Sequence, residues 1–350
     1  MKLERISLSS SEKLGLLSNI STMLEAGIPI LEVIDSLLED SKGNQQKFLQ
    51  TLREDLIQGK RLYLSFGKFP AVFDKVTVNI IRASEEAGTL DITLKDLKKN
   101  IQRDIEFIDK VKAALIYPIM IVIVFVGVLL MILIFVVPKI SSVFSRLNVD
   151  LPLPTKIMIA LSNTLIAYAI PVVVVTIAAI IGFIILYKHN KKFMLGALSS
   201  LPLIQKLVKN IDLTRFTRSL YLLLNAGLPI TSALELTEDV VLKKEVYAAI
   251  KHTKETVLGG AKLSKGFKDK REIFPSIVIK IAEAGERSGS LEKSMQDASE
   301  YLDYEVTNTL KTITTLLEPL LLVVAGSLIG GMMLTIVSPI YNLIGQVGGR

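Results

Sequence analysis

Three long apolar runs dominate the hydropathy pattern of the chain. Residues 115–137 and 157–187 contain no charged side chain, and residues 316–337 hold a single ionisable residue, Glu318. A helix rises about 1.5 Å per residue, so about 20 apolar residues cross a hydrocarbon core of roughly 30 Å. The three runs therefore predict three transmembrane helices, the second with its core at about 165–187.

Outside these runs the apolar residues recur every three or four positions, which is the spacing of an amphipathic helix. No stretch shows sustained period-two alternation, so we expect an all-α fold. One continuous stripe consists of Leu90, Leu94, Leu97, Ile101, Ile105, Ile108 and Val111. A matching stripe consists of Leu291, Met295, Ala298, Leu302, Val306 and Leu310. The helices predicted before the first span are 13–25, 29–39, 44–57, 60–66, 73–86 and 90–112, a six-helix-type bundle whose last helix continues into that span.

The chain contains two copies of one pattern, about 200 residues apart. The segment LEAGIPI at 24–30 recurs as LNAGLPI at 224–230, and EEAGTL at 85–90 recurs as ERSGSL at 286–291. The second offset, 201, also joins Phe73 with Phe274, Pro118 with Pro319, and Pro138 with Pro339. A nearly constant offset predicts two repeated cytoplasmic bundles, each followed by one membrane helix, with the second span as the connector.

The Ala-Gly-x-Pro motif has a direct conformational interpretation. Glycine just after a helix can adopt the left-handed conformation that ends it, and proline presets the first turn of the next helix. We therefore expect tight helical hairpins at Gly27–Pro29 and Gly227–Pro229. In the second motif, Gly88 and Gly289 are expected to end a helix in the same way.

Two acidic residues, Glu85 and Glu286, occupy equivalent positions one turn before these helix ends. A carboxylate near a helix C-terminus is unfavourable with the helix dipole. Two explanations stay open. Each glutamate is solvated or paired with a local Lys or Arg, or each is placed to meet a partner or a fixed basic residue.

Charge supports the topology. The chain has 41 basic and 34 acidic residues, a net charge of +7. Residues 1–114 are neutral in sum, whereas residues 188–312 carry 20 basic and 15 acidic side chains, a surface suited to an anionic membrane or a protein partner rather than nucleic acid. Lys110 and Lys112 before the first span place its preceding bundle in the cytoplasm by the positive-inside rule.

The predicted division is 1–114 cytoplasmic bundle, 115–137 first transmembrane helix, 138–156 external loop, 157–187 second transmembrane helix, 188–315 second cytoplasmic bundle, 316–337 third transmembrane helix and 338–350 external tail.

The composition leaves little catalytic chemistry. The chain has no Cys and two His, and it lacks phosphate-binding, dinucleotide-binding, metalloprotease and serine-hydrolase motifs. His189 and His252 are expected at interfacial and surface positions. Asp35, Glu39 and Asp40 gather acidic oxygens, where a cation site is conceivable but a solvated face is favoured. We predict no enzyme activity and no cofactor.

The third span carries two features of its own. Glu318 is ionisable and lies about two residues inside the boundary, so it either reaches the headgroups or has a buried functional role. Gly326 and Gly330 have the spacing of small residues that permits close packing of membrane helices. We expect helix association through this span, and hence a homo-oligomer.

Together these motifs resemble the type II secretion F family. The resemblance rests on Leu-x-Ala-Gly-[Ile/Leu]-Pro and Glu-x-[Ala/Ser]-Gly-[Thr/Ser]-Leu in each half, with prolines at both ends of the following span, and covers about 12–346. The family motif residues carried over are Gly27, Pro29, Glu85, Gly88, Gly227, Pro229, Glu286 and Gly289.

The resemblance implies an inner-membrane platform protein of type IV pilus, type II secretion or competence-pseudopilus machines. Its implied partners are a hexameric cytoplasmic assembly ATPase, pilins or pseudopilins, and other inner-membrane assembly proteins. The platform would couple the ATPase to extraction and polymerisation of pilins. A transporter or channel is disfavoured because spans almost without internal charge leave little to line a pathway. A membrane-anchored helical adaptor or a membrane enzyme would also fit the spans, although no nucleophile–base pair supports an enzyme.

Overall fold

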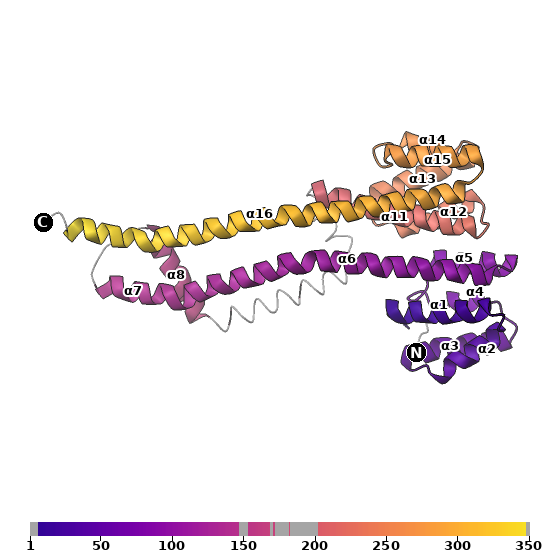
Figure 1. Ribbon diagram of the computed structural model, residues 1–350, viewed down its shortest axis with the longest axis horizontal. Coiled ribbons are helices and arrows are strands. Elements are labelled where there is room, and N and C mark those ends of the chain that lie inside the picture. Colours follow the sequence, from indigo (N-terminus) through magenta and orange to yellow (C-terminus); the bar gives the residue numbers. More distant parts are fainter. Residues whose placement is uncertain (1–5, 147–152, 169–170, 172–181, 183–201, 348–350) are drawn as a thin grey trace. The chain divides into compact units, whose positions relative to one another are not determined.

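The computed structural model describes residues 6–146, 153–168, 171, 182 and 202–347. These residues contain helices and connections but no strand, which confirms the predicted all-α class. The chain divides into two compact units (Figure 1). Unit 1 consists of Met1–Lys110, here called the first half, and Pro202–Thr309, called the second half. Unit 2 consists of Val111–Leu201 and Leu310–Arg350.

The helices of the first half begin and end within three residues of their predicted positions, except that the last one continues beyond residue 112. They are α1 (Ser10–Glu25), α2 (Ile30–Glu39), α3 (Gly43–Ile57), α4 (Leu62–Gly67), α5 (Lys75–Ala87) and α6 (Leu90–Met131). A capping box, in which Ser9 and Glu12 satisfy each other's backbone N–H groups, fixes the start of α1. The helix α6 continues without a break into the first apolar run, as predicted.

The second half has the same order of helices at nearly the same offset along the chain. They are α11 (Pro202–Asn225), α12 (Ile230–Thr237), the 3₁₀ turn η3 (Glu238–Val240), α13 (Lys244–Leu258), α14 (Leu263–Asp269), α15 (Ser276–Ser288) and α16 (Leu291–Val347). α16 also continues through the third apolar run without interruption, and it extends into the segment expected as a tail.

Aromatic side chains pack at matching positions of both halves. Phe66 and Phe73 in the first half have ring centroids 4.5 Å apart, and Phe267 and Phe274 in the second half have centroids 4.2 Å apart. All four side chains are fully buried. The phenylalanine match found in the sequence thus reflects a core position in each half.

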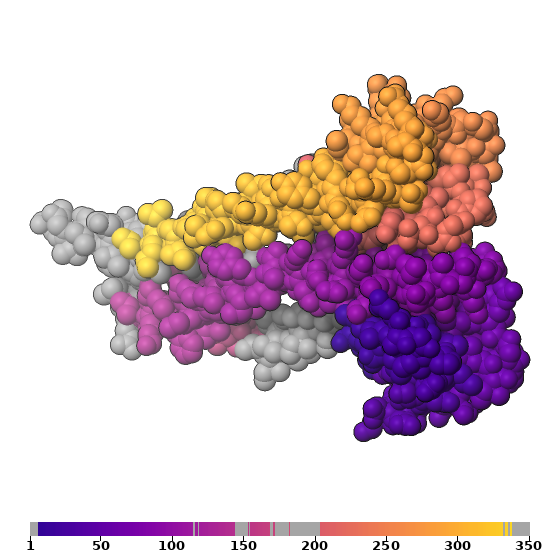
Figure 2. Space-filling view, turned by 45° about the vertical axis from the view of Figure 1, so that its right-hand side comes forward, coloured from indigo at the N-terminus to yellow at the C-terminus, as the bar shows by residue number. Residues whose placement is uncertain are grey.

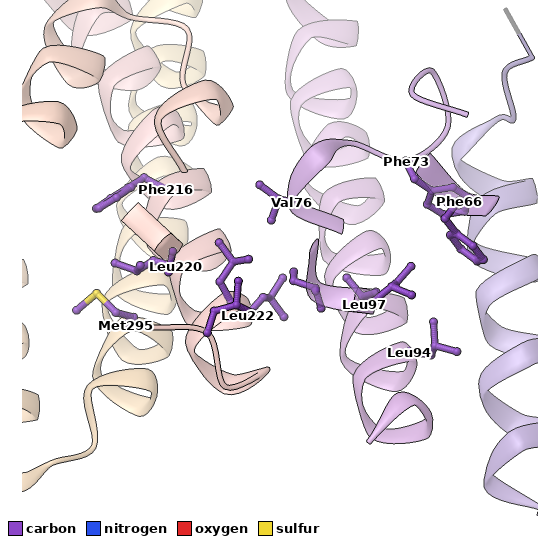
Figure 3. Close-up of a cluster of buried hydrophobic side chains, with 14 of the residues drawn as sticks. Phe66, Phe73, Val76, Leu94, Leu97, Phe216, Leu220, Leu222 and Met295 are labelled. Carbon is purple, nitrogen blue, oxygen red and sulfur yellow. The ribbon is translucent and has the colours of Figure 1, made fainter. Parts of the chain in front are cut away.

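One apolar core extends through both halves of unit 1. Figure 3 shows some of its side chains: Val76 of the first half and Leu222 on α11 are directed toward each other's half, whereas Leu97 is directed toward Phe66 within the first half. These three residues are 2–6% exposed. The helix α5 packs against α11 and α12 of the second half. Side chains of α6 also reach α11 and α16. Burial of apolar surface at this seam stabilises the two halves as one unit.

Unit 2 contains the apolar helices. Two helical stretches, Leu90–Val143 and Leu291–Gly331, are long and apolar enough to cross a membrane by length and composition. Their most apolar windows are 6% and 0% buried, whereas the core helix of a soluble protein is mostly buried. The yellow part of α16 accordingly lies at the surface in the view of Figure 2. Leu322 and Leu334, within this part of the helix, are exposed. The predicted second span reaches the described residues only in α8 (Leu153–Ala167), and its core lies mainly outside them.

The expected external loop is partly helical. A π-helical turn, η2 (Ile132–Val136), precedes α7 (Val137–Arg146). Pro138 lacks a backbone N–H, and its ring would clash with the carbonyl one α-turn earlier, so the wider π-turn relieves both problems. The buried Ser162 hydroxyl donates to the carbonyl of Leu133 within this turn. Residues 147–152 lie outside the described residues.

Candidate functional site

The Ala-Gly-x-Pro motifs form two helical hairpins of the same geometry. Gly27 has a φ of 81° and Gly227 a φ of 84°, which confirms the left-handed conformation predicted for both. After α1, the N–H of Gly27 donates to the Leu24 carbonyl at 2.9 Å, and the N–H of Ile28 donates to the Met23 carbonyl at 3.0 Å. This pair of hydrogen bonds is a Schellman motif, and α11 ends with the same pair. Pro29 and Pro229 are the N-cap residues of α2 and α12, one position before the first helical residue.

Glu85 connects the end of α5 to the start of α4. Its two carboxylate oxygens accept hydrogen bonds from the backbone N–H groups of Leu62 and Tyr63, at 2.8 and 3.2 Å. Gly88, three residues later, ends α5 with a φ of 70°. The negative side chain therefore lies at the N-terminus of α4, where the unpaired N–H groups and the helix dipole both favour it.

Glu286 makes the equivalent connection in the second half. It accepts a hydrogen bond from the backbone N–H of Ser264 at 3.1 Å and a second one from the Ser264 hydroxyl. Gly289 then ends α15 with a φ of 71°. Because Glu286 lies in the last turn of α15, its side chain reaches the first turn of α14 and pins the two helices together.

These contacts answer the question that the sequence left open about Glu85 and Glu286. Each glutamate meets the N-terminus of a neighbouring helix rather than a basic side chain. The arrangement explains locally why an acidic residue stands near a helix C-terminus: the cost at its own helix is offset by stabilising another. Any role of these two residues in binding a partner stays a proposal.

The sequence reasoning missed an ionic cluster at the seam between the halves. Arg218 on α11 is 7% exposed, and its Nη1 donates to Asp104 Oδ1 on α6 at 2.8 Å. Its Nη2 donates to Asp303 on α16. Among the described residues, Arg218 Nε and the neighbouring Asn100 Oδ1 and Ser299 Oγ are buried without a hydrogen-bond partner. The seam is therefore polar at this point, and each of the three helices contributes a charge.

A cleft of about 790 Å³ lies beside this cluster within unit 1. It is lined by both halves, with charged and amide side chains that include Asp74, Lys75, Asn79, Asp104, Arg215 and Asp239. Lys75 and Asp239 approach each other across it at 3.2 Å. The mixture of positive and negative side chains gives the cleft no preference for an anion or a cation. In the part of the chain that the structure describes, no group of three or more His, Asp or Glu residues could hold a metal ion.

In unit 2, Glu318 has a partner at the equivalent position of the other long helix. The Tyr117 hydroxyl donates to Glu318 Oε1 at 3.4 Å, which joins α6 to α16. Both residues are exposed, and each is followed by a proline, Pro118 or Pro319, inside a continuous helix. Because Glu318 is exposed, it lies at the surface of unit 2 rather than in a buried site.

Gly326 and Gly330 leave open space on α16. A Cβ atom added at either position would meet no atom within 4 Å. The described part of the chain therefore places nothing against this small-residue face, which leaves the predicted helix association through it untested.

The comparison with known proteins decides the family. The family model for type II secretion system (T2SS) protein F matches residues 16–138 and again 216–339. The chain belongs to the type II secretion system protein F family. Each match runs from a set of short helices of unit 1 into one of the two long apolar helices in the described part of the chain, α6 or α16. The family resemblance drawn from the paired motifs is thereby confirmed.

Relatives of this family member carry names from two kinds of machine. The type IV pilus assembly protein PilC of Pseudomonas aeruginosa is 30% identical over 337 residues, covering 94% of this chain and 89% of the relative. PilC of Myxococcus xanthus is 27% identical over 330 residues, 93% and 79% of the two chains. The type II secretion system protein F of Pseudomonas aeruginosa is 26% identical over 332 residues, 94% and 82%. The family consists of membrane proteins of pilus and secretion machines.

Proposed function

We propose that this protein is an inner-membrane platform that couples a cytoplasmic assembly ATPase to extraction and polymerisation of pilins or pseudopilins. Membership of the protein F family supports the class of machine. The observation that carries the coupling is the continuity of α6 and α16. Each helix begins inside a packed bundle and runs unbroken into an exposed apolar stretch. A continuous helix is stiff, so a displacement of its bundle reaches the membrane segment.

The proposed organisation is two copies of one bundle joined by three membrane helices. The double match to the family model and the recurrence of helix order support the two copies. The basic flanks support a cytoplasmic N-terminus and an external C-terminus. The second transmembrane helix, at 157–187, returns the chain to the cytoplasm in this organisation. The platform acts mechanically and catalyses no reaction.

The motif residues have defined places in this proposal. Gly27, Gly227 and their prolines shape the hairpins, while Glu85 holds α4 against α5 and Glu286 holds α14 against α15. Gly326 and Gly330 offer a face on which a second copy of the membrane helix packs closely. The partners are the hexameric ATPase, pilins or pseudopilins, and other inner-membrane assembly proteins.

The coupling is tested by interrupting the helices where unit 1 passes into unit 2. A Gly-Gly-Ser insertion after Lys110 and another after Thr309 break the stiffness of α6 and α16 while leaving both bundles intact. We expect assembly of surface pili or pseudopili to be lost in a strain that carries only this variant. Binding of the purified assembly ATPase is expected to persist, as measured by co-purification.

A matched insertion provides the control. Seven helix-forming residues at the same two places add about two turns and keep each helix continuous. We expect this variant to retain at least part of the assembly. Wild-type assembly by the Gly-Gly-Ser variant would refute coupling through these helices. Loss of ATPase binding with intact bundles would place the ATPase contact at the insertion points instead.

A further inference from the structure

The exposed side of α14 carries a row of positive charges. Lys262, Lys265 and Lys268 are spaced three residues apart and are all exposed, whereas Leu263, Ser264, Gly266 and Phe267 form the buried side. The three lysines are called the basic face here. Residues three apart lie on the same side of a helix, so the row extends about 9 Å along α14.

The basic face has no partner among the described residues of its own chain. The equivalent corner of the first half, which is the α3–α4 connection together with α4, has different contacts. There Lys60 and Lys68 both contact Asp55, and Arg61 lies 3.4 Å from Glu86. In the second half Thr256, Ala261 and Asp269 stand where the first half has Asp55, Lys60 and Lys68, so that ionic cluster is absent. Arg287 stands where the first half has Glu86, so Lys262 lacks the anion that its counterpart Arg61 meets. The lysines of α14 are therefore available to an external acidic group.

An exposed acidic row of similar length lies on α2. Glu32, Glu39 and Asp40, called the acidic face here, are exposed and have no ion-pair partner in the described part of the chain. Their neighbour Asp35 is already paired with Arg53 at 2.5 Å. Glu32 and Glu39 are seven residues apart, which corresponds to about 10 Å along a helix. The acidic face is therefore opposite in charge to the basic face and similar to it in length.

Each face carries one charge where its own helix disfavours it, although Glu32 in the first turn of α2 and Lys268 in the last turn of α14 lie where the dipole favours them. Lys262 is the N-cap residue of α14, and Asp40 is the C-cap residue of α2. The helix dipole disfavours a cation at the first position and an anion at the second. Local helix stability thus does not explain either charge, whereas a docking contact between opposite faces does.

The two faces belong to helices with different neighbours within the chain. α2 packs against α1 and α3, and α14 packs against α13 and α15, while the halves meet through α5 and through side chains of α6. A second copy of the chain supplies the missing counterpart to each face. We propose that the basic face of one copy docks on the acidic face of α2 in the next copy, a head-to-tail contact. Complementary charge favours this orientation over contacts that join like faces.

The absence of cysteine allows a direct test on the full-length protein in detergent micelles. Ser36→Cys places a single thiol among the acidic face, and Asp269→Cys places one beside Lys268; both positions are exposed. The two variants, tagged to differ in size, are mixed and treated with a short bifunctional maleimide. We expect cross-links between position 36 of one copy and position 269 of another, with few cross-links when either variant is treated alone.

Charge reversal then tests the chemistry of the contact. Lys262→Glu, Lys265→Glu and Lys268→Glu together should lower the cross-link yield by a factor on the order of ten. Reversing Glu32, Glu39 and Asp40 to Lys in the other partner should restore it. The matched control, Lys244→Glu, Lys251→Glu and Lys293→Glu, changes the net charge equally at exposed positions and should leave the yield unchanged.

The proposal is overturned if cross-links join only like positions, or if the reversals do not alter the yield. It is also overturned if no cross-link forms and the reversal instead abolishes binding of the assembly ATPase or of nanodiscs containing phosphatidylglycerol. Those outcomes would assign the basic face to a soluble acidic protein or to anionic lipid. The cross-linking result is independent of the helix-interruption experiment, because it does not depend on pilus assembly.

Discussion

The two halves of unit 1 stabilise the same corner by different interactions. It lies between α3 and α4 in the first half and between α13 and α14 in the second. In the first half the Ser65 hydroxyl donates to the buried Asp55 carboxylate at 2.8 Å. In the second half Gly266 stands at the equivalent position, and a Cβ added there would lie 2.9 Å from the Cα of Thr253. One corner is held by hydrogen bonds and ion pairs, and the other by close approach of two helix backbones.

The same difference recurs at the end of the following helix. Ser84 on α5 is buried, and its hydroxyl donates a hydrogen bond to the Ile81 carbonyl at 2.9 Å. Its counterpart on α15 is Gly285, where an added Cβ would lie 2.6 Å from the Cβ of Ser294. Equal helix order therefore does not imply equal contacts. Matched substitutions in the two halves should have unequal effects, and this inequality can be measured.

The largest effect is expected for Gly285→Ala. Alanine normally stabilises a helix interior by up to about 1 kcal/mol relative to glycine. Here the methyl group has no room beside Ser294, so we expect the free energy of unfolding to fall by about 3 kcal/mol. Urea unfolding of the full chain in detergent, followed by circular dichroism, measures the change.

Two further variants sharpen this comparison. Ser84→Ala in the first half removes one hydrogen bond and needs no new space, so the expected loss is about 1 kcal/mol. Adding Ser294→Gly to Gly285→Ala should recover most of the stability, because it removes the atoms that the new methyl group meets. Equal losses for Gly285→Ala and Ser84→Ala would contradict the difference between the halves.

A smaller effect, with a pH signature, is expected for Asp55→Asn. Burial alone would raise the pKa of Asp55, but hydrogen bonds from Lys60, Lys68 and Ser65 outweigh it and lower the pKa to about 2. A lowered carboxyl pKa stabilises the fold above the unfolded value and loses this contribution as pH falls through the folded value. At pH 7 the substitution should therefore lower the free energy of unfolding by about 2 kcal/mol. The difference from wild type should shrink between about pH 4 and pH 2.

The control for Asp55 lies at its counterpart in the second half. The Thr256 hydroxyl donates to the His252 carbonyl at 2.9 Å and belongs to no ionic cluster among the described residues. Thr256→Val should lower the stability by about 1 kcal/mol or less, by the same amount at pH 3 and pH 7. A pH-independent loss for Asp55→Asn would show that the carboxylate charge does not hold the first corner.

The smallest effects are expected where the halves agree. Glu85→Gln and Glu286→Gln keep an oxygen that can accept from the N-terminus of α4 or α14 but remove the charge that strengthens the bond. We expect each to lower the free energy of unfolding by about 1 kcal/mol. Both variants should still support pilus or pseudopilus assembly in a complementation assay.

The glutamine variants also separate folding from binding. Substitution by lysine would place a cation at the positive end of a helix and destabilise the fold. A loss of assembly in the lysine variant would therefore not distinguish unfolding from lost binding to a partner. If a glutamine variant kept wild-type stability and still failed to assemble pili, the carboxylate would act on a partner instead. Unequal stability changes for Glu85→Gln and Glu286→Gln would show that the two connections differ in strength.

Helix positions were determined mainly by local sequence. The apolar stripe from Leu90 to Val111, the glycines with positive φ, and the charge-free runs each depend on neighbours within a few residues, so their pattern predicts them. The wider π-turn before Pro138 was not predicted, because its form depends on Ser162 as well as on the missing N–H group.

Only the tertiary structure decided which side chains meet. Glu85 and Leu62 are 23 residues apart, and Arg218 and Asp104 are 114 apart, so no periodicity connects them. The pattern of α11 shows that Arg218 lies among buried neighbours, but it cannot show that two carboxylates from other helices pair with it. The reason is physical: periodicity reports which side of a helix avoids water, whereas pairing of buried charges depends on how separate helices pack.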